Sequence, residues 1–208
     1  MNYNDTRQEV IAFLIHCQWT QDCWVMHSSF FNKNPAIVNL NKHCPVLDRF
    51  LKSYSHISLA YTVLQIGKLH DTENSSLTIK SIWKKSMNYC SRIKQDLNFT
   101  DSEMAKKKVH FEKIKNELDY FHECHIRKPR NFIIAHSDAK TYLNDASFEL
   151  LPDKDMEDFY LKKLKKLSDT LLEFWSIEET EIKPLDQDAK NDTEAVVQRL
   201  ISCVLSST

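Results

Sequence analysis

The chain has 208 residues, a formal net charge of −1 and a single glycine. One glycine argues against folds that depend on many tight turns, and it excludes glycine-rich loops that bind nucleotides. A near-neutral chain is not a uniformly basic nucleic-acid binder, so any RNA contact must come from a local patch. The length suits one sizeable core or two small ones, and together these features predict an all-α fold, most simply as one domain.

Six cysteines are scattered along the chain without a C-x-x-C pair: Cys17, Cys23, Cys44, Cys90, Cys124 and Cys203. The chain also has no signal peptide and no apolar run long enough to cross a bilayer. We therefore expect a cytoplasmic protein without membrane association, whose thiols are reduced and mostly buried.

A zinc site is the alternative raised by His122, Cys124 and His125. Three ligands within four residues cannot all point the same way on a helix, and no second cluster has finger-like spacing. We therefore expect no metal, and no motif suggests a cofactor.

The first helix is predicted over residues 5–31, capped by Asp5 or Thr6, with apolar residues at near-helical spacing: Val10, Phe13, Leu14, Cys17, Trp24 and Phe31. After an asparagine-rich loop, Pro45 opens a second helix with one apolar stripe: Leu47, Phe50, Leu51, Tyr54, Ile57, Tyr61 and Leu64. Gly67, near its end, either lets another backbone approach closely or only marks the end of the helix.

The third helix is predicted to begin at Ser75 or Ser76 and to break near Asn88. Thr100 begins a fourth helix, whose apolar residues form one buried stripe: Phe111, Ile114, Leu118 and Phe121. The basic run 106–108 is either a solvated face or a track for RNA, and the solvated face is the simpler interpretation.

A further helix is predicted from Pro152 and Asp153, with lysines outward and these residues inward: Met156, Tyr160, Leu164, Leu167, Leu171 and Trp175. Residues 1–176 should form one domain, an up-and-down bundle of long amphipathic helices. Residues 177–208 should form a polar linker and a C-terminal amphipathic helix that covers the core, joins a dimer or binds a partner.

The stretch 128–138 carries the residues best suited to chemistry. Arg130 and His136 flank four apolar residues that favour burial, so the chemistry is tied to a core element. Pro129 is expected to start a new helix with Lys128 outside it, which would place Arg130 in a first turn that attracts phosphate. Alternatively, Arg130 pairs with a carboxylate and His136 only ends a core helix.

On an ideal helix the step from Arg130 to His136 turns about 600°, which leaves the two side chains roughly 120° apart. They would not share one face of a single helix. A two-fold axis, where the motifs of two subunits converge in one cleft, offers a simpler way to build a compact site. The spacing therefore favours a homodimer.

Two short motifs suggest a family. The segments Arg130-Asn131 and Ala135-His136-Ser137-Asp138 resemble the Arg-x(4–6)-His signature of the HEPN superfamily, and most closely its AbiU-type abortive-infection branch. Upstream, Lys68-Leu69-His70-Asp71 and the serine-containing turn after it are similar to a second motif of that branch. It departs from that motif at Lys68, where arginine is expected, and at His70, where an apolar residue is expected.

The resemblance implies an all-helical, HEPN-like domain and a metal-independent RNA endonuclease of a toxin–antitoxin or antiphage system, with a composite site at a homodimer interface. Arg130 and His136 would be catalytic, supported by Asn131, Asp138, Asp71 and Lys68. We expect Asp71 to hold Arg130 or His136 by a charge-assisted hydrogen bond. RNA is the expected substrate, and an antitoxin or inhibitory protein a further partner. The alternative is a non-catalytic HEPN-like module that binds RNA or protein.

Overall fold

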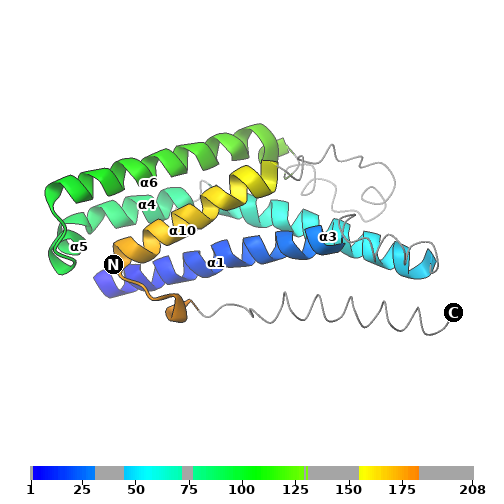
Figure 1. Ribbon diagram of the computed structural model, residues 1–208, viewed down its shortest axis with the longest axis horizontal. Helices are drawn as coiled ribbons and strands as arrows, with labels where there is room; N and C mark the ends of the chain where they lie inside the picture. Colours follow the sequence, from blue (N-terminus) through cyan, green and yellow to red (C-terminus); the bar gives the residue numbers. More distant parts are fainter. Residues whose placement is uncertain (1, 31–44, 72–76, 129, 131–154, 183–208) are drawn as a thin grey trace. The chain divides into compact units, whose positions relative to one another are not determined.

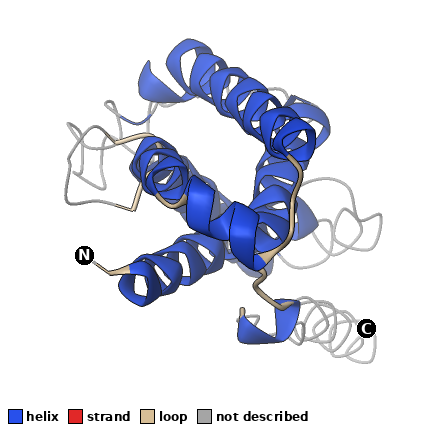
Figure 2. Ribbon diagram, turned by 90° about the vertical axis from the view of Figure 1, so that its left-hand side faces the viewer, coloured by secondary structure: helices blue, strands red, loops and turns tan. Residues whose placement is uncertain are grey.

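The computed structural model describes residues 2–30, 45–71, 77–128, 130 and 155–182. Helices dominate these residues, and none of them forms a strand (Figure 2). The all-α prediction is thus confirmed. The chain divides into two compact units, which are described separately: unit 1 comprises residues 1–17 and 64–183, and unit 2 comprises residues 18–63 and 184–208.

In chain order, the helices are α1 (Tyr3–Phe30), α3 (Pro45–Leu69), α4 (Ile79–Asn88), α5 (Cys90–Asp96), α6 (Asp101–Phe121) and α10 (Lys162–Trp175) (Figure 1). Two π-helical segments join them: η1 (His122–Ile126) continues α6, and η2 (Met156–Leu161) leads into α10. A short 3-10 turn, η3 (Glu179–Glu181), follows. The predicted break near Asn88 is confirmed, because α4 ends there.

Polar side chains at the helix starts satisfy backbone N–H groups that have no partner inside the helix. Thr100 and Glu103 form a capping box at the start of α6, as predicted. Thr78 caps α4 by accepting a hydrogen bond from the Ser81 N–H at 3.1 Å, so the predicted cap at Ser75 or Ser76 is wrong.

The first helix also begins earlier than predicted. The Asp5 N–H donates to Asn2 Oδ1 at 2.9 Å, and the Asn2 N–H donates to Asp5 Oδ2 at 3.3 Å. Asn2 is therefore the cap of α1, in place of Asp5 or Thr6, because an asparagine paired with an acidic residue three positions later satisfies these N–H groups equally well.

In unit 1, helices α6 and α10 pack against each other in opposite directions. Lys107 pairs with Glu173 and Lys163 pairs with Glu117, so the partners occur in reverse order along the two helices. Between them lie the residues predicted to face inward, all of them buried: Phe111, Ile114, Leu118, Phe121, Met156, Tyr160, Leu164, Leu167, Leu171 and Trp175. The amphipathic pattern of both helices is confirmed.

Helix α4 closes this core through two aromatic contacts. Trp83 stacks on Phe111 with the ring centroids 4.3 Å apart, and the buried Trp175 Nε1–H donates to Ser86 Oγ at 2.9 Å. An indole buried with its N–H satisfied contributes its full apolar area at little polar cost. The described residues of unit 1 therefore share one continuous core.

Unit 2 contains the second half of α1 and most of α3, and it differs from the prediction. Its buried residues include Trp24, Leu59 and Val63. Four members of the predicted stripe of α3 are instead exposed, by 37% to 64%: Phe50, Tyr54, Ile57 and Tyr61. Helix α3 has two apolar faces, and hydrophobicity alone cannot tell which of them packs inward.

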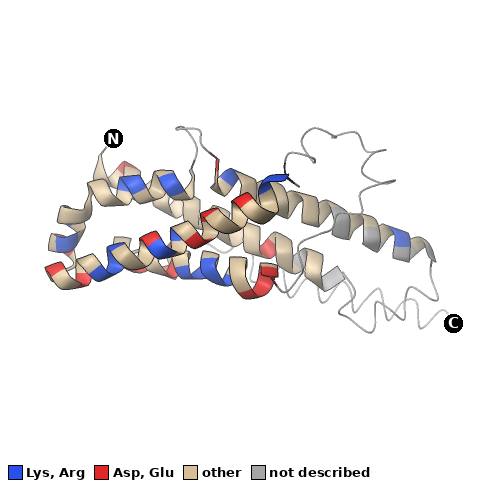
Figure 3. Cartoon of the chain, turned by 90° about the horizontal axis from the view of Figure 1, so that it is seen from above, with Lys and Arg blue, Asp and Glu red and all other residues tan. Residues whose placement is uncertain are grey.

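Among the described cysteines, Cys17, Cys23 and Cys90 are buried free thiols and Cys124 is exposed, while Cys44 and Cys203 lie outside the described residues. Burial raises the pKa of Cys23 to about 11 and that of Cys17 further still. Positive and negative side chains are interspersed along the helices (Figure 3). The described part of the chain includes no helix with the length and hydrophobicity needed to cross a membrane.

Candidate functional site

Arg130 lies against the only glycine of the chain. A Cβ atom placed on Gly67 would lie 2.3 Å from Arg130 Cδ and 2.5 Å from Arg130 Nε, distances that no real side chain tolerates. Gly67 is buried and lies within α3, which continues to Leu69. Gly67 therefore permits the close approach of a side chain, not of a backbone, and it does not end the helix.

The guanidinium of Arg130 is held at the end of α3. Arg130 Nη2 donates a hydrogen bond to Asp71 Oδ2 at 3.2 Å, and the two side chains are 22% and 31% exposed. The structure thus brings together Asp71 and Arg130, as expected from the two motifs. Contact with Gly67 on one side and with Asp71 at the tip fixes the orientation of the guanidinium, and the bond to Asp71 uses one of its five N–H donors.

The other predicted site residues are placed less fully. Lys68 is exposed on the last turn of α3. Burial lowers the pKa of His16, and the positive charge of Lys68 lowers it further. His136, Asn131 and Asp138 lie outside the described residues, so their roles stay predictions.

The backbone before Arg130 corrects one prediction. Lys128 was expected outside a helix, yet residues 127, 128 and 130 are helical. The Arg127 N–H donates to the His122 carbonyl, which is a π-type bond that carries the helix on from η1. The extended preference of a residue before proline is only a bias, which an existing helix outweighs. Lys128 and Arg130 are therefore helical, and the expectation that an open first turn at Arg130 attracts phosphate is not supported.

His70 directly precedes Asp71, and its buried side chain forms hydrogen bonds with two other residues. Its Nδ1–H donates to Asp119 Oδ1 at 2.9 Å, and its Nε2 lies 3.1 Å from the Tyr160 hydroxyl. The His70 side chain is only 2% exposed. Burial raises the pKa of Tyr160 well above its usual value, so the hydroxyl keeps its proton. Both ring nitrogens of His70 are thus used.

The His70 imidazole stacks on that of His122, with ring centroids 4.5 Å apart and planes 7° from parallel. Burial lowers the pKa of His122 to about 4, and the positive charges of His70 and Arg130 act in the same direction. His122 is therefore neutral at physiological pH.

His122 has one unsatisfied atom. Its Nε2 is buried and has no hydrogen-bond partner within the described part of the chain, while Nδ1 lies 3.7 Å from Glu123 Oε1. A buried polar atom without a partner costs about 1–3 kcal/mol. Such an atom in a folded protein calls for an explanation, and a functional site is a common one.

Both π-helical segments meet at this cluster. His122 begins η1, and Tyr160 belongs to η2. A π-turn accommodates one residue more than an α-turn and is found most often at functional sites. Here the two segments bring an imidazole and a phenol to His70 from separate helices.

This cluster was not among the predictions from the sequence. His70 stood out only as a departure from the expected apolar residue, and His122 only as a candidate zinc ligand. No group of three or more His, Cys, Asp or Glu side chains among the described residues could hold a metal ion. A histidine in an otherwise apolar helical stripe was the available signal, since a buried histidine requires partners.

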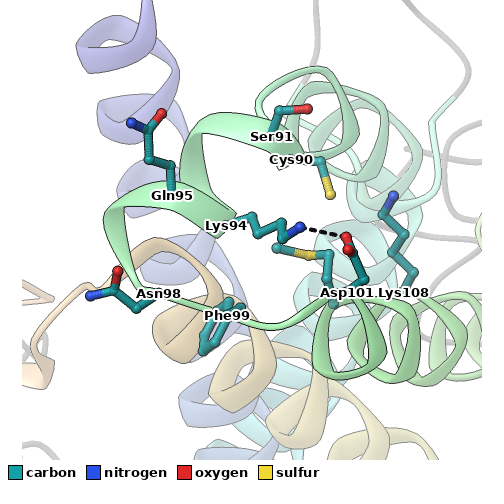
Figure 4. A pocket seen from close by; sticks show the side chains of 9 residues that line it. Cys90, Ser91, Lys94, Gln95, Asn98, Phe99, Asp101 and Lys108 are labelled. Carbon is teal, nitrogen blue, oxygen red and sulfur yellow. Dashed lines mark hydrogen bonds and ion pairs between the residues drawn. The ribbon is translucent and has the colours of Figure 1, made fainter.

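A second polar site lies at the α5–α6 junction. There a pocket of about 610 Å³ is lined by residues that include Cys90, Lys94, Asn98, Asp101 and Lys108 (Figure 4). The Lys94 ammonium, its central cation, is paired with Asp101. This pocket is open, and none of the predicted site residues lines it.

The geometry defines an all-helical protein in which the end of one long helix holds the arginine of another element. In comparisons with known proteins, the family model HEPN_AbiU2, described as AbiU2, matches residues 3–192. The chain belongs to this family, and its fold is HEPN-like. No curated protein and no solved structure matches the chain.

Proposed function

We propose that the protein is a metal-independent RNA endonuclease that acts in abortive infection or in a toxin–antitoxin pair. The observation that carries the proposal is the oriented guanidinium of Arg130, seated on Gly67 and bound to Asp71 at 3.2 Å. An arginine whose fork is held at one nitrogen, with donors left over, suits the binding of a phosphodiester. Family membership supports the same reading.

In the proposed reaction, neutral His136 accepts the proton of a ribose 2′-hydroxyl. The 2′-oxygen then attacks the adjacent phosphorus, the bond from phosphorus to the 5′-oxygen breaks, and a 2′,3′-cyclic phosphate remains. Arg130 stabilises the charge that develops on the phosphoryl oxygens, and Asp71 keeps its fork in position. Asn131, Asp138 and Lys68 are assigned to orientation of these groups and of the RNA.

The departing 5′-oxygen needs a proton, which a protonated His136 of a second subunit would supply. A homodimer with both motifs at its axis would thus provide a base and an acid in one cleft. The exposed apolar residues of α3 in unit 2, such as Phe50 and Ile57, offer a surface of the kind that dimers bury. This surface supports the dimer as part of the proposal.

A non-catalytic module that binds protein is the second candidate. Lys and Arg are interspersed with Asp and Glu along the described helices (Figure 3), and this pattern favours the second candidate because it gives those helices no continuous basic track for RNA. Expression separates the two candidates. A ribonuclease toxin should arrest cell growth when expressed, whereas an Arg130→Ala variant, or a non-catalytic module, should not.

The direct test is cleavage of single-stranded or loop RNA in EDTA by the purified protein. We expect His136→Ala and Arg130→Ala each to abolish cleavage, with helicity unchanged. Arg127→Ala is a matched control, because Arg127 is exposed and, among the described residues, forms its ion pair with Glu123 four positions earlier in the chain. Cleavage that survives loss of Arg130 or of His136 would contradict the mechanism.

The dimer has its own test. A His136→Ala subunit and an Arg130→Ala subunit, both inactive alone, should recover part of the activity when mixed, because each retains the group that the other lacks. Sedimentation should show a dimer. A fully active monomer would refute the composite site and leave the reaction itself untouched.

A further inference from the structure

The end of α3 presents two consecutive side chains to different partners. Asp71 binds the Arg130 guanidinium, and His70 bonds Asp119 of α6 and Tyr160 of η2. The backbone that joins His70 and Asp71 has left the helix, since residue 70 is a turn and residue 71 has no regular structure. Two turn-type hydrogen bonds tie this backbone to the helix, from the His70 N–H to the Gly67 carbonyl at 3.2 Å and from the Asp71 N–H to the Lys68 carbonyl at 3.3 Å. A single turn of this kind holds a backbone less firmly than a continuing helix does, so the side-chain contacts of His70 add to what defines the position of Asp71.

We propose that His70 is the positioning residue for Arg130, because it fixes the last turn of α3 and thereby presents Asp71 to the guanidinium. This inference rests on the proposed function for its catalytic consequence. Its structural half concerns the protein without RNA and can be tested separately.

Burial and contact geometry support this role. The His70 side chain is 2% exposed, and contacts from three elements hold its ring in place: the Asp119 carboxylate, the Tyr160 hydroxyl and the stacked His122 ring. A ring held in this way cannot rotate without breaking at least one hydrogen bond. It is the better anchored of the two side chains, because Asp71 is 31% exposed.

Chemistry explains why an apolar residue would not serve. Asp119 has a lowered pKa, because the hydrogen bond and charge of His70, helped by Lys115, outweigh the opposing effect of burial. A leucine or valine at position 70 would leave the Asp119 carboxylate and the Tyr160 hydroxyl without this partner. The polar contacts would then no longer select one position for the end of α3.

Charge placement supports the same inference. Burial lowers the pKa of His122, and the positive charges of His70 and Arg130 lower it further. A neutral His122 can pack its ring on His70 without adding a cation beside Arg130. The stack thus anchors His70 and preserves Arg130 as the group that attracts phosphate.

The experiment compares His70→Leu and His70→Asn with the wild type by two readouts. The first is the Arg130 Nε–H signal in nitrogen–proton correlation spectra of the arginine side chains, recorded on the full chain without RNA and assigned with Arg130→Lys. We expect a slowly exchanging signal in the wild type, loss of that protection in His70→Leu, and recovery in His70→Asn. The asparagine amide can donate to Asp119 from nearly the position of the imidazole Nδ1.

The second readout is RNA cleavage. His70→Leu should lower kcat by about 100-fold and change KM by less than about threefold, because a misplaced arginine loses transition-state contacts more than it loses RNA. His70→Asn should recover most of kcat. His110→Leu is the matched control, since His110 is an exposed histidine of α6, and it should change neither readout.

Two outcomes would overturn the inference: an unchanged Arg130 signal in a folded His70→Leu variant, or a loss of activity that tracks stability and is not recovered by asparagine. If His70→Leu does not fold, Tyr160→Phe replaces it, because it removes one hydroxyl bond to His70 and keeps the ring. An unprotected Arg130 in the wild type would also contradict the proposal. If the wild type cuts no RNA but its Arg130 signal responds to position 70, the proposed function fails and the positioning role stands.

Discussion

Unit 1 contains two ion pairs of the same chemical kind, each between a basic residue and an aspartate. Arg130–Asp71 has an N–O distance of 3.2 Å, and Lys94–Asp101 has a distance of 2.5 Å. The longer pair is the more buried, with exposed fractions of 22% and 31% against 36% and 93%. Distance alone would rank the two pairs in the wrong order, because water screens an exposed pair far more than a half-buried one.

The two sites also differ in what surrounds each pair. Lys94 reaches across an open turn to Asp101 (Figure 4). Arg130 is confined by Gly67 and adjoins the cluster of buried side chains around His70. A charge that packing holds in one orientation can act on a ligand, whereas a charge on a flexible exposed stem mainly aids solubility.

The largest expected effect is on acid stability. His122 has a pKa of about 4 in the fold and about 6.5 when unfolded, so its contribution is fully present above pH 6.5 and is lost as the pH falls toward 4. Between pH 7.5 and 4, the free energy of unfolding should fall by about 3 kcal/mol more in the wild type than in His122→Phe. Urea titrations at several pH values measure this difference. Parallel pH curves for the two proteins would refute it.

The two aspartates should respond differently to the same substitution. Asp71→Asn should lower the free energy of unfolding by about 1–2 kcal/mol, whereas Asp101→Asn should leave it almost unchanged because Asp101 is fully exposed. RNA cleavage should fall about 100-fold in Asp71→Asn and stay unchanged in Asp101→Asn. Equal effects at the two positions would remove the distinction between the sites.

Gly67→Ala tests the close contact between Gly67 and the Arg130 side chain. The added methyl group should push the flexible arginine away from Asp71, and the better helix propensity of alanine should offset part of the cost, so stability should change by less than about 1 kcal/mol. Cleavage should be lost nonetheless. In an Arg130→Ala background, where the clash is absent, Gly67→Ala should instead add about 0.5–1 kcal/mol. A destabilising Gly67→Ala in that background would show that another group fills the space.

The smallest effect belongs to Lys94. Lys94→Met should change the free energy of unfolding by less than about 0.5 kcal/mol, and this difference should disappear in concentrated salt. Denaturant unfolding at two salt concentrations provides the measurement. A larger loss that persists in salt would mean that the exposed pair is more tightly held than its accessibility indicates.

Amphipathic periodicity was enough to predict the helices of unit 1. Residues such as Phe111 and Leu164 repeat at helical spacing, and a helix can bury only one such face. The same reasoning failed for α3, because a helix with two apolar faces satisfies the pattern in either orientation. Tyr54 and Tyr61 belong to the predicted apolar stripe and are exposed.

The candidate site was predictable only as far as its motifs. The contact between Asp71 and Arg130 followed from the two motifs, but Gly67 was assigned only a general close approach. The contacts of His70 with His122 and Tyr160 could not be anticipated, because they depend on two π-turns. Hydrophobic periodicity does not predict where a helix contains a π-turn with one extra residue.

That extra residue makes the site sensitive to the length of the chain. Deleting one position within η1 would let the segment relax into an ordinary α-helix and turn everything beyond it by about 100° about the axis. Arg130 would then leave Gly67 even though every residue named in its motif was still present. Substitutions at the exposed positions Glu123, Cys124 and His125 would not change the number of residues in η1, so the rotation of the later residues about the helix axis would stay the same. Among relatives, side chains should therefore vary freely at these three positions, while the count of residues between Phe121 and Arg130 should stay constant.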